Sequence, residues 1–427
     1  MAEIVDVAER RPIAVDLFAG AGGMSLGFEQ AGYDVVAAVE VDPIHAAVHA
    51  FNFPDCVVIP RSVTEMAGEG IRKAAGIGNR MVDVVFGGPP CQGFSLIGKR
   101  AIDDPRNLLV REFVRLVSEL RPRHFVMENV KGLTAGKQRQ VLDELIEEFG
   151  SHGYSVKTPW RVLNAVDYGV PQDRQRLFLM GALNGETVPD YPDPLTRHPQ
   201  KAGEPPAAPT CAEAIGDLPD ADGFPELLNQ DSVWTGKPGT LTDYARELRA
   251  DGDHGWHFGH RRRWEPDVLT CSGRTNHSAL SAGRFAATEP GATEPVSRFY
   301  RLRPDSVSNT LRAGTDAGRG AFTSPRPIHY RYPRCITVRE MARLHGYPDW
   351  FQFHRTKWHG AREIGNSVPP PLARAVAGAI MKASGAEPLL SELTHPAMDS
   401  DMLSFDMGQA CSFWNVGRTI GTRKSGG

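Results

Sequence analysis

A single cysteine in a stiff loop flanked by glycines is the first candidate for chemistry. Residues 87–95 read Gly-Gly-Pro-Pro-Cys-Gln-Gly-Phe-Ser and follow an apolar run that is typical of a buried strand. The two prolines restrict the approach to Cys91, and the glycines leave its sulfur accessible. The loop would lie at the carboxyl end of a parallel strand, where open α/β sheets place their ligands. We therefore expect Cys91 to be a nucleophile. Four other cysteines are expected to be small buried apolar residues: Cys56, Cys211, Cys335 and Cys411.

A carboxyl group and two guanidinium groups are expected at the same edge of the sheet. Glu128 ends a predicted strand at its carboxyl edge, with capping of the following segment as the alternative role. Arg174 and Arg176 stand at i and i+2 before the next predicted strand, so both should point to one side of an extended chain. Two guanidinium groups placed in this way can hold a phosphate or a carboxylate.

A glycine-rich turn follows the first predicted strand and opens a helix. Residues 16–27 read Asp-Leu-Phe-Ala-Gly-Ala-Gly-Gly-Met-Ser-Leu-Gly, and such glycines let the backbone approach a nucleotide-like ligand closely. The strict dinucleotide fingerprint fails because Ser25 stands where it needs glycine or alanine. Glu40 ends the second strand 20 residues after Gly20, where a carboxylate can accept hydrogen bonds from ribose hydroxyls. The pair indicates a nucleoside cofactor, although a purely structural turn would also fit the glycines.

Short β-branched runs alternate with amphipathic helical runs over residues 12–184, which predicts a mostly parallel sheet covered by helices. The predicted strands are residues 12–18, 34–40, 56–60, 82–86, 124–128 and 176–180. Helices with one apolar face are predicted over 109–120 and 141–149. The proline-rich stretch 185–210 then indicates a linker or a domain boundary.

Composition and charge limit the class of protein. The chain has 427 residues with 41% hydrophobic and 23% charged residues, which is typical of a globular protein of two or three folded units. The net charge is -3, yet acidic residues dominate 185–255 and arginine dominates 256–384, so a polyanion-facing surface is plausible beside ordinary solvated ion pairs. The cysteines are far apart with no C-x-x-C pair, which favours a reducing compartment. The sequence predicts no export signal and no membrane span, and hence a cytoplasmic, nucleoid-associated protein.

Taken together, these motifs resemble the DNA (cytosine-5) methyltransferase family of bacterial or phage type. The resemblance rests on seven motifs in order: Asp16 to Gly23, Glu40, Gly88-Pro-Pro-Cys-Gln-Gly93, Glu128-Asn-Val130, Gln172-x-Arg-x-Arg176, Arg339 to Asp349, and Gly365-Asn-Ser-Val-Pro-Pro370. It implies an α/β fold, with a Rossmann-like class I methyltransferase sheet, helices on both faces, and a smaller, mostly irregular or β target recognition domain. The implied domains are 1–184 (catalytic and S-adenosylmethionine-binding), 185–320 (target recognition), 321–384 (return to the catalytic domain) and 385–427 (C-terminal tail).

The resemblance implies S-adenosyl-L-methionine as cofactor. The residues expected to bind it are Phe18, Gly20, Gly22, Gly23, Glu40, Val41, Ser62, Val63, Pro89, Leu109, Asn366, Ser367 and Val368. One departure stands after the third strand, where the family usually has an acidic residue and this chain has Ser62, which can still accept a hydrogen bond. The helix that normally precedes the first strand is expected from residues 371–383.

The implied reaction is methylation of cytosine carbon 5 in a short, specific duplex sequence, with a covalent cysteine adduct and a flipped base. Its catalytic residues would be Cys91, Glu128, Arg174 and Arg176. Double-stranded DNA is the expected partner of a monomer, with a cognate restriction endonuclease or another defence-system protein as further candidates. The residues expected to contact DNA are Gln92, Ser95, Lys99, Arg100, Arg106, Arg261, Arg262, Arg263, Arg274, Arg284 and Arg312.

Three rival interpretations remain open at this point. An RNA-methylating relative would carry a shorter insert, a catalytically dead DNA-binding or scaffold protein would lack Cys91 or the cofactor motif, and Ser25 argues against a nicotinamide-dependent oxidoreductase. His254, His257 and His260 at three-residue spacing, with Cys271 further on, could suggest a metal site. We expect no metal there because no second cysteine completes a tetrahedral set.

Overall fold

The protein is built around one mixed sheet of eight strands. The computed structural model describes residues 10–90, 107–134, 138–250, 252, 254–315 and 325–417. The strand order is β3-β2-β1-β4-β5-β8-β6, and β7 pairs with β8 beside β6. The strands of this sheet are β1 (Ile13–Leu17), β2 (Asp34–Val39), β3 (Val57–Ile59), β4 (Val84–Gly87), β5 (His124–Val130), β6 (Tyr154–Val156), β7 (Arg161–Asn164) and β8 (Gln175–Leu183).

The direction of the strands divides the sheet into two parts. Strands β3, β2, β1, β4 and β5 run parallel, whereas β8 is antiparallel to β5 and pairs antiparallel with both β6 and β7. All six strands predicted from the sequence are therefore present, and two short ones, β6 and β7, were missed. The carboxyl ends of β1, β2, β4 and β5 meet at one edge, which is where the candidate residues lie.

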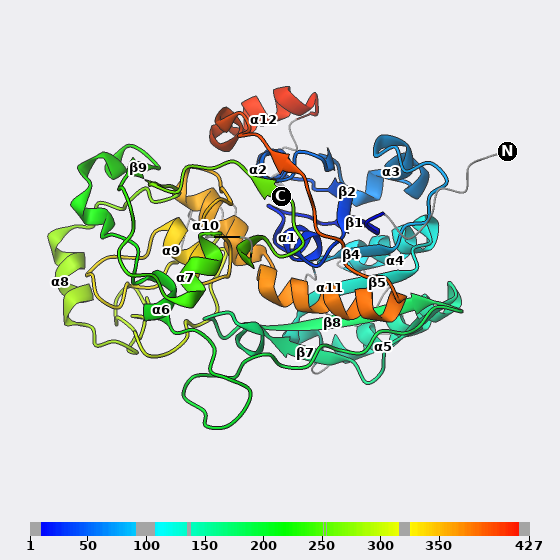
Figure 1. Cartoon of the computed structure of the whole chain (residues 1–427), viewed down its shortest axis with the longest axis horizontal. Coiled ribbons are helices and arrows are strands. Elements are labelled where there is room, and N and C mark those ends of the chain that lie inside the picture. The colour runs from blue at the N-terminus through cyan, green and yellow to red at the C-terminus, as the bar shows by residue number, and fades with distance from the viewer. Residues whose placement is uncertain are drawn as a thin grey trace, which may run out of the picture.

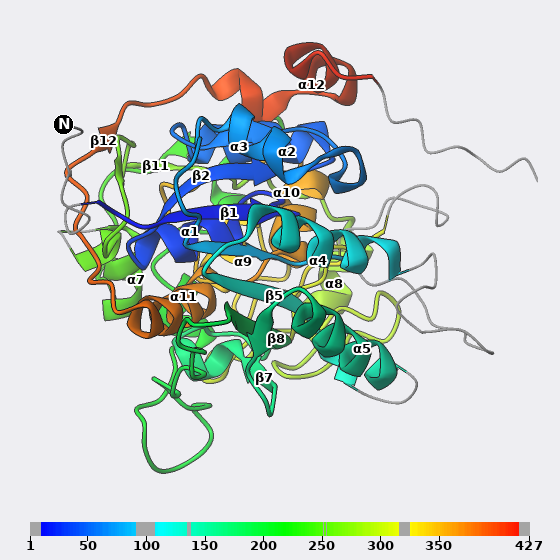
Figure 2. The same ribbon diagram turned by 90° about the vertical axis from the view of Figure 1, so that its right-hand side faces the viewer.

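Alternate strand residues feed two separate cores. Val15 and Leu17 of β1 face one core together with α3 (Gly68–Ala74), α4 (Leu108–Leu120) and α5 (Gln138–Ser151). Ala14 of β1 and Phe86 of β4 face the other core, together with α1 (Gly23–Gln30) and α11 (Pro370–Ser384). This alternation follows from the period of two in a strand, and it produces a three-layer arrangement with α4 and α5 on one side (Figure 2).

The helix predicted over residues 371–383 is present as α11, and it packs against α1. In Figure 1, α11 runs along the sheet beside α1. A Cβ atom added at Gly27 of α1 would lie 2.4 Å from Cβ of Ala373 in α11, so this close approach needs glycine. Residues near the two ends of the sequence therefore form one side of the sheet.

The insert 185–320 is mostly irregular within its described residues. Its elements that are labelled in Figure 1 lie to the left of the sheet. Its regular elements are short: α6 (Cys211–Ile215), β9 (Val233–Trp234), α7 (Asp243–Leu248), β10 (Arg261–Arg262), β11 (Val268–Leu269) and α8 (Ala279–Ala287). Strands β9 and β11 pair with each other, and β10 pairs with β12 (Thr394–His395) in the tail.

The remaining helices connect the insert and the tail to the sheet. They are α2 (Pro43–Asn52), α9 (Val338–Arg343), α10 (Lys357–Asn366) and α12 (Met407–Trp414). The tail folds back over α2, where the indole nitrogen of Trp414 donates to the carbonyl of Pro43 at 3.1 Å (Figure 1). Among the described residues, no helix is long and apolar enough to span a membrane.

Candidate active site

The first turn of the cleft is built from a strained residue and a sequence of glycines. Phe18 follows β1 with φ 69, a left-handed backbone conformation that is uncommon for residues other than glycine. Gly20 has φ 53, and nothing lies within 4 Å of a Cβ added there, so its backbone faces open space. The amide of Gly20 donates to Oε2 of Glu40 at 2.8 Å. The turn thus connects the carboxyl ends of β1 and β2.

Glu40 is held in place by backbone amides on both sides. Its Oε2 accepts from Gly20, and its Oε1 accepts from the amide of Asp42 at 2.8 Å. Burial raises the pKa of Glu40, although His45 and these amides act in the opposite direction. A carboxylate fixed in this way can present its remaining lone pairs to two neighbouring hydroxyl groups of a ligand.

Residues 366–368 close the cleft over the glycine turn. A Cβ atom added at Gly23 would lie 2.5 Å from the carbonyl oxygen of Val368 and 2.9 Å from Cβ of Ser367. Only glycine permits this contact. Asn366 and Ser367, which were expected at the cofactor site, both lie in the wall of the cleft.

A carboxyl group and a guanidinium group form the polar centre of the cleft. Nε of Arg176 lies 2.8 Å from Oε1 of Glu128, and their side chains are 15% and 12% exposed. A Cβ added at Gly88 would lie 2.7 Å from Oε2 of Glu128, so this glycine makes room for the carboxyl group. Burial raises the pKa of Glu128, and the attraction of Arg176 and Arg174 only partly opposes it.

The proline loop is attached to the same strand. Asn129 follows Glu128 on β5, and its amide nitrogen donates to the carbonyl of Pro89 at 3.0 Å. Pro89 and Pro90 both border the cleft. Sequence reasoning did not assign a role to Asn129, although it stands in the Glu128-Asn-Val130 motif. The hydrogen bond fixes the proline segment relative to Glu128.

Arg174 does not act with Arg176 on one anion, which corrects the prediction for that pair. Its fully buried guanidinium donates to the carbonyls of Leu311 at 3.0 Å, Gly365 at 2.9 Å and Ser367 at 2.8 Å. Burial and the nearby Arg176 lower the pKa of Arg174 to about 9. Strand β8 begins at Gln175, so the alternation expected of an extended chain does not reach Arg174. Through these three hydrogen bonds, Arg174 holds Leu311, Gly365 and Ser367 against the end of the sheet.

One continuous cleft of about 790 Å³ contains the glycine turn, Glu40 and the Glu128–Arg176 pair. That volume lies in the range of small-molecule sites. The predicted cofactor residues in its wall are Phe18, Gly20, Gly23, Glu40, Val41, Ser62, Val63, Pro89, Leu109, Asn366, Ser367 and Val368. Gly22 is not in the wall: with φ 102 it caps α1, and a Cβ there would lie 2.3 Å from the ring of Phe53. Gly22 therefore serves the turn rather than the cleft.

Several residues of the cleft were missed from the sequence. Asp16 is buried and accepts from the hydroxyl of Ser25 at 2.6 Å, which gives Ser25 a structural role. His45 and Glu363 also face the cleft, and burial raises the pKa of Glu363 to about 7. The position of Glu363 just before the Gly365-Asn366 motif was the only signal for it.

The predicted nucleophile and its loop cannot be placed. Cys91 lies outside the described residues, as do the candidates for DNA contact Gln92, Ser95, Lys99, Arg100 and Arg106. Cys91 directly follows Pro90, which lines the cleft. The other five cysteines are free and buried. Burial was predicted for Cys56, Cys211, Cys335 and Cys411, and the structure shows it for Cys271 as well.

The predicted DNA-contacting arginines of the insert differ in exposure. Arg262 is a correction: its side chain is 8% exposed, pairs with Glu29 and stacks over Trp350, so it is not available to DNA. Arg274 pairs with Asp222 at 3.1 Å and Arg284 with Glu294 at 3.4 Å. Arg261, Arg263 and Arg312 are exposed.

Two of the three histidines with three-residue spacing, His257 and His260, do not converge on one point. His257 contacts Glu247 at 2.9 Å, whereas Nδ1 of His260 lies 2.5 Å from the hydroxyl of Ser391. The sulfur of Cys271 is near Gln352, at 3.6 Å from its Oε1. The arrangement considered from the spacing is therefore not formed.

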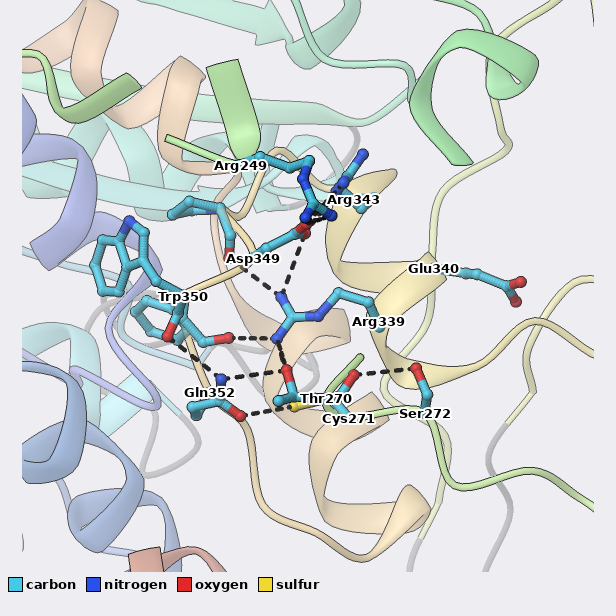
Figure 3. A network of polar contacts seen from close by, with 12 residues as sticks. Arg249, Thr270, Cys271, Ser272, Arg339, Glu340, Arg343, Asp349, Trp350 and Gln352 are labelled. Carbon is cyan, nitrogen blue, oxygen red and sulfur yellow. Dashed lines mark hydrogen bonds and ion pairs between the residues drawn. The ribbon is translucent and has the colours of Figure 1, made fainter. Parts of the chain in front are cut away.

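The motif 339–349 joins the insert to the catalytic part. Arg339 is buried and donates to Thr270 of the insert at 2.8 Å and to the carbonyl of Phe351 at 2.8 Å (Figure 3). Asp349 accepts two hydrogen bonds from Arg343, at 2.5 and 2.7 Å, and pairs with Arg249 of the insert. This network holds the insert in a defined position relative to α9.

Substitution of Asp349 by asparagine should therefore destabilise the protein by roughly 1–3 kcal/mol, because Arg343 would lose one of its two buried carboxylate partners and keep only Asp217. Burial alone would raise the pKa of Asp349, but Arg343 outweighs it and holds that pKa below its usual value. A depressed carboxyl pKa stabilises the fold above roughly pH 4, and this stabilisation is lost as the pH falls through the folded value. Urea unfolding of D349N at pH 7 and pH 3 tests both statements.

The matched control for this prediction is Asp305→Asn, which removes an exposed carboxylate paired with Arg303. The control should change stability little, because exposed ion pairs contribute little. Equal effects of the two substitutions would contradict the assigned role of Asp349.

Comparison with known proteins identifies the family. Residues 13–382 match the C-5 cytosine-specific DNA methylase family, and the chain belongs to that family. It is 56% identical over 417 residues to the Type II methyltransferase M.XorII of Xanthomonas oryzae pv. oryzae, covering 97% of this chain and 95% of that protein. It is 33% identical over 374 residues to the Type II methyltransferase M1.HphI of Haemophilus parahaemolyticus, covering 86% of each. The chain is thus a DNA (cytosine-5) methyltransferase of the type II restriction-modification kind.

Solved structures agree with the fold. A DNA modification methyltransferase described as encoded within prophage Cp of E. coli superposes with a TM-score of 0.69 at 32% identity, covering 87% of this chain and 99% of that one. The S. pombe Dnmt2 methyltransferase superposes with a TM-score of 0.51 at 16% identity over 87% of this chain and 99% of that one, which supports the fold alone. The predicted Rossmann-like methyltransferase sheet is confirmed.

Proposed function

We propose that this enzyme transfers the methyl group of S-adenosylmethionine to carbon 5 of cytosine within one short duplex DNA sequence. The observation that carries the proposal is the continuous cleft, which contains a nucleoside-type turn and the Glu128–Arg176 pair together. A methyl donor and a base bound in such a cleft would be held in contact, and contact between reactants is the first requirement of group transfer.

The described residues fit the donor chemically. Glu40 can accept hydrogen bonds from two ribose hydroxyls, and the open backbone of Gly20 allows close approach. Ser62 shares a hydrogen bond of 2.7 Å with Thr64 and keeps acceptor capacity toward an adenine amino group. S-adenosylmethionine supplies an electrophilic methyl group on a sulfonium sulfur. The residues of the protein would bind, orient and activate the base.

Cytosine carbon 5 is a weak nucleophile, so the protein must first raise its electron density. The Cys91 thiolate would attack carbon 6 of the base. Glu128 would donate a proton or hydrogen bond to the ring nitrogen N3, a role that suits a carboxyl group whose pKa burial has raised. Arg176 would position Glu128 through its 2.8 Å contact. Carbon 5 would then take the methyl group as the bond between that group and the sulfonium sulfur breaks. Loss of the carbon 5 proton to water would finally break the bond to carbon 6 and release the Cys91 thiolate.

A base inside a duplex cannot reach this cleft, so the target cytosine must be flipped out. The segment after Cys91, with Lys99, Arg100 and Arg106, is proposed to close over the DNA. The insert 185–320 is proposed as the recognition domain, and Arg261, Arg263 and Arg312 as its first candidates for guanine edges or phosphates. One cleft and one insert suffice for a monomer, and a cognate endonuclease would be its functional partner.

The test is to express the chain in a methylation-free bacterial host and to map 5-methylcytosine at base resolution, with a Cys91→Ala strain as control. Methylation at one short sequence in the wild-type strain alone would establish the reaction and the recognition sequence. A blank map from soluble protein would overturn the proposal for duplex DNA and would direct the search to RNA.

Substitution of Glu40 by alanine is expected to weaken binding of S-adenosylmethionine by roughly tenfold to a hundredfold, the usual cost of losing hydrogen bonds to a charged group. Calorimetric titration with the unreactive product S-adenosylhomocysteine measures the affinity. The control is Glu65→Ala, an exposed carboxylate that does not border the cleft. An affinity of E40A within threefold of the wild type would remove Glu40 from the cofactor site.

A further inference from the structure

Two histidines and an aspartate meet where three distant segments of the chain join. Asp55 lies in the turn between α2 and β3, His260 directly precedes β10 of the insert, and His395 ends β12 of the tail. Strands β10 and β12 pair in parallel, with Arg262 opposite His395. Strand β12 comes from much later in the sequence than β10, with which it pairs. Figure 2 shows β12 on the outer side of the molecule. None of the three residues borders the active-site cleft.

The spacing of these side chains is that of a metal site. One potential ligand atom from each of Asp55, His260 and His395 lies within 4.8 Å of the other two. Nε2 of His395 is 3.4 Å from Oδ2 of Asp55. Bonds of about 2.0–2.1 Å to a tetrahedral zinc ion place ligand atoms roughly 3.3 Å apart, so this separation already fits. Shifts of about 1.5 Å at most in side-chain position would bring the third ligand into range.

The hydrogen bonds support the same interpretation. The side chain of His395 is 9% exposed, and its Nε2 makes no hydrogen bond with any described residue, only the ion-pair contact of 3.4 Å with Asp55. Such an atom is costly to bury unless something else binds it. His260 has one ring nitrogen on the hydroxyl of Ser391, at 2.5 Å, which orients the ring. Metal-bound histidines commonly use their second nitrogen in this way.

The surroundings can accept further positive charge. Three carboxylates face the small cavity here, those of Glu29, Asp34 and Asp55. Arg262 already makes a bidentate contact with Glu29, and Arg11 is paired with Asp34 at 2.6 Å. The carboxylate of Asp55 therefore has no guanidinium partner in this group of side chains. Oδ1 of Asp34 lies 3.4 Å from Nε2 of His260 and is the nearest candidate for a fourth ligand.

We propose that Asp55, His260 and His395 bind one zinc ion that fastens the insert and the tail to the catalytic domain. Two imidazoles and a carboxylate are typical zinc ligands, and a site outside the cleft would serve structure rather than methyl transfer. The ion would join segments more than 100 residues apart, so it would limit movement of the recognition insert relative to the sheet. This proposal does not depend on the proposed function.

The test is a titration of the full chain, prepared without a polyhistidine tag and stripped with a chelator, with Zn²⁺ by calorimetry. The wild type should bind one equivalent, and His260→Ala, His395→Ala and Asp55→Asn should each weaken binding at least tenfold. The matched control His152→Ala removes a partly exposed histidine that is paired with Glu148 on α5, and it should bind as the wild type does. Titration with Co²⁺ should give the intense visible absorption of a tetrahedral site.

A second measurement covers variants that fold poorly. Zn²⁺ should raise the thermal unfolding midpoint of the wild type and of H152A, but not that of D55N, which changes an exposed residue. Binding of less than one-tenth equivalent by the wild type would overturn the proposal. So would one-equivalent binding that all three ligand variants retain at unchanged affinity.

Discussion

Replacement of Cys91 by alanine is expected to abolish methyl transfer, with a loss on the order of 10⁴-fold or more, while the fold and the affinity for S-adenosylmethionine are retained. The reason is chemical: without a nucleophile at carbon 6, carbon 5 of cytosine keeps too little electron density to accept a methyl group. Cys91 directly follows Pro90, and Pro90 borders the cleft that holds Glu128. Transfer of labelled methyl groups to duplex DNA containing the mapped sequence measures the loss.

A mechanism-based trap separates the covalent step from other defects. DNA with 5-fluorocytosine at the target should form a stable adduct with the wild type, because fluorine cannot leave carbon 5 as a proton does. C91A should form none. The control Cys411→Ala, a buried cysteine on α12, should retain both adduct and activity. Activity of C91A within tenfold of the wild type would exclude Cys91 as the nucleophile.

The central strands could be predicted because burial on both faces of the sheet requires mainly apolar residues. Strands such as β1 and β4 are fully buried, and apart from Asp16 their residues are apolar or glycine. Strands β6 and β7 contain three and four residues with mixed polarity, and their pairing with β8 is set by contacts across the sheet. No local pattern records such a pairing, so the sequence alone did not reveal them.

The arginines show a second limit of prediction from the sequence, which concerns the partner that each side chain meets. Arg261, Arg262 and Arg263 are adjacent and chemically identical, yet only Arg262 has its side chain buried against Glu29, 233 positions away. Arg174 and Arg176 differ in the same way, because the partners of Arg174 are carbonyls that the fold brings from residues 311–367. A residue type and its spacing predict what a side chain can bind. Which partner it meets depends on contacts between distant segments.

Glu40 could be predicted from the sequence because its role is local. It is fixed by amides two and twenty positions away in the chain. His260 marks the opposite case. Its spacing in the sequence suggested a metal site with His254, His257 and Cys271. In the structure, His260 instead lies beside Asp55 and His395, which are far from it in the sequence.

Substitution of Glu128 by glutamine should lower the rate of methyl transfer by roughly 10²–10⁴-fold, the usual contribution of a positioned general acid. Glutamine keeps the size of the side chain in the space that Gly88 leaves, and it can still donate a hydrogen bond. It cannot transfer a proton to the base. The expected loss should therefore fall mainly on kcat, with little change in the KM for S-adenosylmethionine.

The pH profile distinguishes this role from a structural one. Burial raises the pKa of Glu128, so the protonated acid persists to higher pH than in an exposed glutamate. Wild-type activity should fall as the pH rises through that value, because the acid form is lost, and this limb should be absent in E128Q. The exposed control Glu65→Gln should keep the wild-type rate and profile. If E128Q retained the wild-type rate and the same alkaline limb, Arg176 alone would have to bind the base, and the carboxyl group would serve only to orient that guanidinium.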